Sequence, residues 1–191
     1  MLESVPPERL RSPRMLIRCW HPDDAPAFKR SLDASLEAMR PWIPWTRAEP
    51  SELSVLTARL AGYREDFFAG RDALYGLLDL DDREVLGGIG LYRRVGPGAI
   101  ELGYWIRSDL AGRGLTTEAS RVLTEVAFSL PDIDRIEVHC DPDNGASVAI
   151  PRKLGYRHRE TVHIEDERAT NESGATMIWE MTAARYHEQV I

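Results

Sequence analysis

The ten residues LAGRGLTTEA, Leu110 to Ala119, decide how this chain folds. Two glycines, Gly112 and Gly114, flank Arg113, and an apolar pattern of helical period begins directly after them. Glycine lets backbone N–H groups approach an anion closely, and the N-terminus of a helix attracts negative charge. The segment therefore predicts a phosphate-binding turn between a strand and a helix, with Arg113 as an additional charged donor.

The segments around this turn switch between strand and helix patterns. Residues 99–106 (AIELGYWI) are predicted to form a strand, and residues 115–130 carry one apolar stripe at helical spacing. Residues 135–140 (RIEVHC) return as a strand. A strand, a helix and a second strand at this spacing are typical of a parallel crossover.

The remaining pattern predicts one α/β domain with a mixed sheet over residues 14–183. Further strands are predicted at 14–20, 73–80, 84–93, 156–164 and 175–181, and helices from the HPDD turn (21–24) to Met39, at 51–69 and at 144–154. Residues 1–13 are rich in Pro and Arg and are expected to be poorly ordered, and residues 184–191 are expected to form a C-terminal tail.

The composition limits the classes of partner. The 191 residues include 24 basic and 31 acidic side chains, for a net charge of −7. Because an acidic protein does not attract nucleic acid or anionic lipid broadly, we expect neither as a partner. Cys19 and Cys140 lie among apolar neighbours, which favours buried free thiols over a disulfide or a metal site. No apolar run reaches membrane-spanning length and no signal pattern is present, so a cytoplasmic protein is expected.

Four segments in register resemble the GNAT superfamily of N-acetyltransferases, and within it the RimJ/RimL group, which acetylates protein N-terminal amines. They are PWIPW (41–45), ELGYWI (101–106), AGRGLTTEA (111–119) and DNGAS…KLGY (143–156). The resemblance covers residues 14–183. It implies a GNAT-type α/β fold, in which a mixed, mostly antiparallel twisted sheet is flanked by helices and the central strands 99–106 and 135–140 splay apart.

The resemblance implies acetyl-coenzyme A as the acyl donor, bound in a cleft between the splayed strands, and no metal. The strand end would pair with the pantetheine arm, and the N–H groups of residues 112–117 would hold the pyrophosphate. The implied donor-binding residues are Trp105, Ile106, Arg107, Gly112, Arg113, Gly114, Leu115, Thr116, Thr117, Asn144 and Ser147. The turn departs from the family pattern at Ala111 and Thr116, and Thr116 is expected to cap the helix and donate its hydroxyl to a phosphate.

The tyrosine that many family members use as a general acid is replaced here by Pro151. The resemblance places Ser147, one turn earlier, as the group that protonates the leaving sulfur. A proline inside a helix lacks the N–H that would bond the carbonyl four residues back, which belongs to Ser147. We therefore expect a local kink in which this carbonyl is free to bind water or the cofactor.

For the base, the resemblance favours Glu101, whose apolar sequence neighbours are expected to strengthen it as a proton acceptor. A solvent-facing strand position is the alternative for Glu101. Glu165 or Asp166 is a second choice of base. His139 faces away from Val138 and Cys140 on its strand, which favours core filling or solvation over catalysis.

Trp42, Trp45 and Glu165 are expected to line the acceptor pocket, although the two tryptophans could instead cover the core. The reaction implied is direct attack, in a ternary complex, of a primary amine on the acetyl thioester. The amine would belong to a protein N-terminus or a small molecule. Two alternatives stay open: a coenzyme A-binding regulator without turnover, and an acyltransferase that uses another donor such as succinyl-coenzyme A. A monomer or a homodimer is expected.

Overall fold

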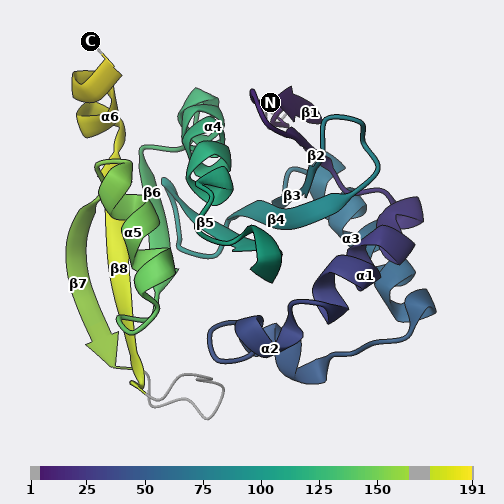
Figure 1. Ribbon diagram of the computed structural model, residues 1–191. Coiled ribbons are helices and arrows are strands. Elements are labelled where there is room, and N and C mark those ends of the chain that lie inside the picture. Colours follow the sequence, from purple (N-terminus) through teal and green to yellow (C-terminus); the bar gives the residue numbers. More distant parts are fainter. Residues whose placement is uncertain (1–4, 164–172, 191) are drawn as a thin grey trace.

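Eight strands form one sheet in the order β1-β2-β3-β4-β5-β6-β8-β7 in the computed structural model, which describes residues 5–163 and 173–190 (Figure 1). Only β5 and β6 are parallel; the other neighbouring pairs are antiparallel. The predicted mixed, mostly antiparallel sheet is therefore confirmed. The strands are β1 (Arg9–Arg11), β2 (Leu16–Cys19), β3 (Ala73–Leu78), β4 (Val85–Tyr92), β5 (Ala99–Ile106), β6 (Arg135–Cys140), β7 (Arg157–His163) and β8 (Ala175–Thr182).

Helices cover both faces of this sheet (Figure 1). They are η1 (Pro22–Asp24), α1 (Ala25–Asp33), α2 (Leu36–Met39), η2 (Pro44–Ala48), α3 (Leu53–Phe68), η3 (Ser108–Leu110), α4 (Leu115–Ser129), α5 (Gly145–Lys153) and α6 (Ala183–Val190). The apolar stripe of α4 packs on one face against alternate residues of β5 and β6, including Ile100 and Ile136. On the other face α1 and α3 pack against β3 residues such as Leu74 and Leu78. These alternate along β3 with Ala73, Tyr75 and Leu77, which point to the α4 side. None of the described helices is long and apolar enough to span a bilayer.

Three local features differ from the sequence-based predictions. Residues 9–11 are not poorly ordered: they form β1, paired with β2, because Leu10 packs on the core and the Tyr75 hydroxyl donates to the Pro7 carbonyl (3.0 Å). Most of the expected C-terminal tail belongs to α6, in which Tyr186 packs on Phe128 of α4 with ring centroids 5.0 Å apart.

The helix that the sequence predicts up to Met39 is interrupted between α1 and α2. The side-chain oxygen of Ser35 accepts a hydrogen bond from the Ser108 N–H (3.1 Å), and the Ser108 hydroxyl donates to the Ala34 carbonyl (3.4 Å). Ser108 is distant in sequence and follows β5, so this break is a tertiary effect that local helical periodicity does not contain.

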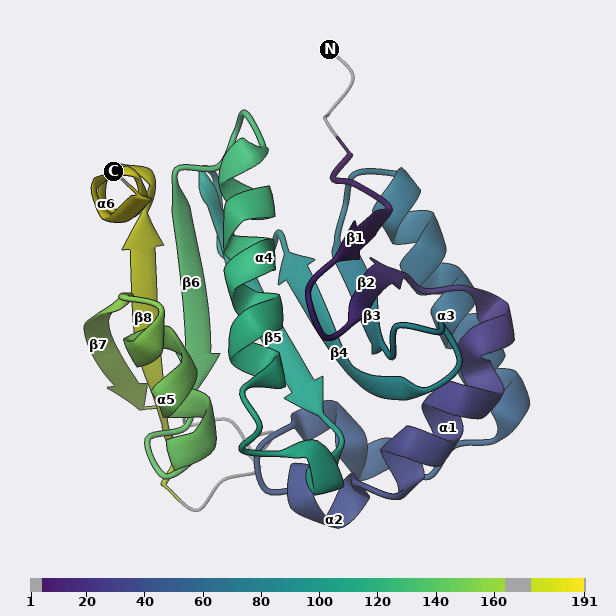
Figure 2. The ribbon, with the colours of Figure 1, turned by 45° about the horizontal axis from the view of Figure 1, so that its top comes forward.

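The predicted splaying of the central strands is visible in the register. β5 pairs with β6 only from Ala99–Arg135 to Glu101–Glu137. Beyond these pairs β5 continues along β4 as far as Ile106, and β6 continues along β8 as far as Cys140. We call residues 102–106 and 138–140 the divergent segments. Figure 2 shows the two strands separating toward their ends beside α4.

Candidate active site

The turn between β5 and α4 has the backbone conformation that its glycines predict. Gly112 and Gly114 have φ values of 76° and 77°, in the left-handed region that disfavours side chains. Crowding does not explain them, because among the described residues no atom lies within 4 Å of a Cβ built on Gly112, and the nearest to one on Gly114 is at 3.6 Å. The backbone path itself requires glycine at both positions.

The N–H groups of residues 112–117 have no hydrogen-bond partner within the parts of the chain that the structure describes. They lie at the start of the 15-residue helix α4, whose first carbonyl bond is Glu118 N–H to Gly114. The side chain of Thr116 does not cap the helix, contrary to the prediction: the cap position is Gly114, without a side-chain bond. A row of free N–H groups at a helix N-terminus is a suitable site for a diphosphate.

Arg14 holds this turn from β2's side of the sheet, a contact that the sequence did not reveal. Its guanidinium donates to the Arg113 carbonyl (2.8 Å) and pairs with Glu118 of α4 (2.6 Å). The Arg113 carbonyl is thereby turned toward Arg14, while the N–H groups of the turn stay unpaired. The contact joins residues 104 positions apart along the chain, so no local pattern indicates it.

The end of β5 presents backbone rather than side chains to the divergent region. The Trp105 ring packs over Gly88, where an added Cβ would lie 2.5 Å from its Nε1, and edge-on to Phe28 at 5.8 Å between centroids. Ile106 packs with the α4 core. The Arg107 N–H donates to the Leu86 carbonyl (2.7 Å) and so is already engaged, unlike the free donor expected for pantetheine.

Ser147 lies in the first turn of α5 with its polar groups bonded. Its N–H donates to the Asn144 side chain (3.1 Å), so Asn144 is the helix N-cap. Its carbonyl accepts from the Tyr104 hydroxyl (3.2 Å), and its own hydroxyl donates to the Tyr104 oxygen (3.4 Å). The expectation of a free carbonyl beside Pro151 is therefore wrong, because Tyr104 supplies the donor that proline lacks.

Glu101 is buried at the last pair before the strands diverge, so the solvent-facing alternative is wrong. Its neighbours are not apolar either. Arg94, in the turn before β5, donates to both carboxylate oxygens at 2.7 and 2.6 Å. This bidentate pair raises the pKa of Arg94, chiefly through the hydrogen bonds to Glu101.

His139 connects Glu101 to a second carboxylate. Its Nε2 lies 2.7 Å from Glu137 Oε2, and its Nδ1 lies 3.7 Å from Glu101 Oε2. The imidazole is 29% exposed, so it is neither core filling nor fully solvated. The sequence-based preference against His139 missed this cluster because Glu101 and His139 come from different strands.

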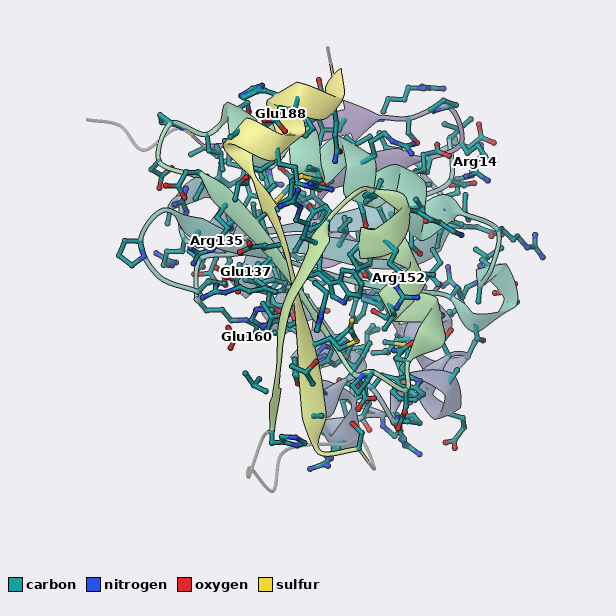
Figure 3. All side chains as sticks on the ribbon, turned by 90° about the vertical axis from the view of Figure 1, so that its left-hand side faces the viewer. Arg14, Arg135, Glu137, Arg152, Glu160 and Glu188 are labelled. Atoms are coloured by element: carbon teal, nitrogen blue, oxygen red, sulfur yellow. The ribbon has the colours of Figure 1, made fainter. Side chains whose placement is uncertain are left out.

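Glu137 is the buried centre of the same cluster. Arg135 (2.9 Å) and Arg159 (3.0 Å) pair with the oxygen that His139 leaves free. Burial alone raises the pKa of Glu137, but the bond to His139 and the charges of His139 and the two arginines outweigh it, so its pKa is lowered. Figure 3 shows Arg135 and Glu137 on one side of β8 and Arg152, on α5, on the other.

Trp42 and Trp45 are 37% and 40% exposed in the segment between α2 and α3. The Arg59 guanidinium lies over the Trp45 ring, 5.7 Å from its centroid. The other expected pocket residue, Glu165, and the alternative base Asp166 lie outside the described residues. The structure therefore places two of the three predicted acceptor residues on an accessible surface.

Both cysteines are free and buried, as predicted. Burial raises the pKa of the Cys140 thiol to about 11, so it stays protonated at neutral pH. No cluster of potential metal ligands occurs within residues 5–163 and 173–190.

Comparison with known proteins agrees with this geometry. The acetyltransferase (GNAT) domain profile matches residues 14–157. The ribosomal protein uS5-alanine N-acetyltransferase of Escherichia coli (strain K12) is 28% identical over 156 residues, which are 80% of each chain. A RimL ribosomal L7/L12 α-N-protein acetyltransferase solved with coenzyme A superposes with a TM-score of 0.80 at 16% identity, covering 93% of this chain and 99% of that one. Mycobacterium smegmatis RimJ, solved with a coenzyme A disulfide, gives 0.74 at 22% identity and covers 92% and 88%.

Proposed function

This chain belongs to the GNAT family of acetyltransferases, and from that premise we propose that it transfers the acetyl group of acetyl-coenzyme A to the α-amine at a protein N-terminus. The observation that supports the donor most directly is the row of unpaired N–H groups from Gly112 to Thr117. The acceptor class is supported by the relative that acts on ribosomal protein uS5, since the similarity covers four-fifths of both chains.

The proposed donor site combines the turn and the divergent segments. Acetyl-coenzyme A supplies an acetyl thioester, a diphosphate and two amides in its pantetheine arm. The N–H groups of residues 112–117 bind the diphosphate, and Arg113 adds a positive charge. The edge of β5 from Leu102 to Ile106, which has no β6 partner, pairs with the pantetheine amides and holds the thioester between the divergent segments.

Glu101 and His139 form the proposed proton acceptor for the attacking amine. They lie where the strands begin to diverge, on the sheet face opposite α4. Arg94 holds both Glu101 oxygens, while Glu137 orients the imidazole through Nε2 and leaves Nδ1 toward Glu101. The amine nitrogen forms its bond to the acetyl carbon, and its proton passes to this pair. The carbon–sulfur bond breaks, Ser147 donates a hydrogen bond to the departing thiolate, and the thiolate takes up a proton to leave as the free coenzyme A thiol.

This arrangement favours an α-amine over a lysine side chain. Deprotonating an α-amine at pH 7 costs about 1.4 kcal/mol, whereas a lysine costs about 4.6 kcal/mol. The α-amine is therefore the acceptor that demands less of the Glu101–His139 pair.

Release of free coenzyme A thiol measures this activity. With acetyl-coenzyme A and a panel of ribosomal-protein N-terminal peptides, we expect turnover with at least one peptide that has a free α-amine. We expect none with the same peptide after N-terminal blocking, even when it retains a lysine. Mass spectrometry of the product locates the acetyl group.

Two results would replace the proposal. Tight coenzyme A binding without turnover on any amine indicates a coenzyme A-responsive regulator. Preferential turnover of succinyl-coenzyme A in competition with acetyl-coenzyme A changes the donor and leaves the class of reaction intact.

A further inference from the structure

We propose that Tyr104 is a positioning residue: its hydroxyl replaces the backbone donor that Pro151 lacks and thereby fixes Ser147 beside the divergent segments. The inference rests on the proposed function, in which Ser147 faces the leaving sulfur. The inference goes beyond the proposed function, because it assigns a specific task to a β5 side chain that acts through Ser147 and not on the reacting atoms.

Tyr104 is placed where it can link the two diverging halves of the sheet. It belongs to the divergent part of β5 and packs against the α4 core, on the same face as Leu102 and Ile106. Its hydroxyl reaches Ser147 on α5, which follows β6. The contact thus connects the β5 half to the β6–α5 half beyond the point where their backbone pairing stops.

The hydrogen bonds to Ser147 show why a donor is needed there. In a regular helix the N–H of residue 151 would bond the Ser147 carbonyl, and Pro151 has no N–H. Ser147 is partly buried, and a backbone carbonyl that is shielded from water is costly to leave without a donor. Tyr104 supplies that donor at 3.2 Å, although it lies 43 residues earlier in the chain.

The same phenol also orients the Ser147 hydroxyl. That hydroxyl donates to the Tyr104 oxygen at 3.4 Å, a long and weak bond that it can exchange for a bond to sulfur. Burial raises the pKa of Tyr104, so the phenol stays protonated and keeps donating to the carbonyl. With its N–H held by Asn144 and its carbonyl by Tyr104, Ser147 keeps one position while its hydroxyl changes partner.

The first test is kinetic. Tyr104→Phe should lower kcat about tenfold with little change in the KM for acetyl-coenzyme A, because orientation at the reacting centre is lost and donor binding is not. In a Ser147→Ala background the same change should lower kcat less than twofold, because Tyr104 acts through Ser147. An equal loss of kcat in both backgrounds overturns the proposal.

The second test is a rescue through Pro151. Pro151→Ala restores a backbone N–H opposite the Ser147 carbonyl, so Tyr104→Phe should lower the thermal midpoint and kcat far less in that background than in the native chain. Losses that simply add show that the two residues do not share this carbonyl, and they overturn the proposal.

A matched control is Tyr75→Phe. Tyr75 is fully buried and, like Tyr104, donates to a backbone carbonyl, that of Pro7 at 3.0 Å. It belongs to β3, which β4 separates from β5. The substitution should lower the thermal midpoint and leave kcat unchanged, with no rescue by Pro151→Ala. If the native chain shows no turnover at all, the proposed function fails, but the thermal cycle between Tyr104 and Pro151 still decides whether the hydroxyl replaces the missing donor.

Discussion

At the scale of single residues, the surroundings of Glu101 come from two other parts of the chain. Its strand neighbours in sequence are apolar, yet the side chain meets Arg94 and His139 once the chain folds. Arg94 reaches it from the turn before β5, and His139 from the adjacent parallel strand. The Glu101 carboxylate therefore lies between a guanidinium and an imidazole and is not an isolated acidic group.

We predict that Glu101→Gln lowers kcat/KM for an N-terminal peptide at least tenfold at pH 7. The loss should shrink as the pH rises toward the pKa of a free α-amine, because a growing fraction of the amine is then already deprotonated and needs no base. A pH profile of thiol release for both forms checks this.

Glu160→Gln is the control, since it removes the same charge from a half-exposed side chain on β7. Glu160 lies 3.3 Å from Arg159, a longer contact than those between Glu101 and Arg94. A deficit of the Glu101 variant that stays constant with pH would contradict proton acceptance at this site.

At the scale of elements, the sequence predicted the helices and strands whose apolar residues repeat at a regular helical or strand spacing. The bounds of β5 and β6 match the predicted 99–106 and 135–140, because each alternates between two packed faces. β1 is three residues long and has no period to detect. The break between α1 and α2 depends on Ser108, and the donor to the Ser147 carbonyl is Tyr104, so neither was visible in a local window.

The turn before α4 gives a prediction at this scale. Gly114→Ala should weaken coenzyme A binding about tenfold, because a side chain at a left-handed φ strains the backbone that presents the N–H groups. Isothermal titration with coenzyme A measures the change.

Gly96→Ala is the matched control, since Gly96 also has a positive φ (124°) with open space around its Cβ position, in the turn between β4 and β5. It should leave the affinity unchanged. Equal effects of the two substitutions would mean that general destabilisation, and not the shape of the turn, controls binding.

At the scale of the whole molecule, the fold extends beyond the residues that the family profile matches. The profile match covers 14–157, but β1 adds a strand at one edge of the sheet, and β7, β8 and α6 complete the other half. Of these additions, β1, β8 and α6 pack on the same core as the donor turn. The strands β7 and β8 match the predicted 156–164 and 175–181, whereas β1 and the helix α6 were not predicted from the sequence.

Deleting residues 1–12 should therefore lower the free energy of unfolding by roughly 2–4 kcal/mol, since it removes β1, the packing of Leu10 and the acceptor of the Tyr75 hydroxyl. Urea unfolding measures the loss. Tyr75→Phe alone should account for about 1 kcal/mol of it. A deletion as stable as the full chain would contradict a structural contribution from β1.

The parallel pair stops after three residues, and this has a consequence for selectivity. Exposed outer strands of a sheet recruit other polypeptides, because a whole chain can align along them. The unpaired edges of the divergent segments are different, because they lie inside the sheet. β4 and β8 flank them on either side, and the paired residues up to Glu101 limit them at one end. Under the proposed function, the pantetheine arm would lie along these unpaired edges as an extended chain. Acyl donors that differ only in the acyl group would then share the same backbone contacts, so selection between them would depend on the side chains around the thioester.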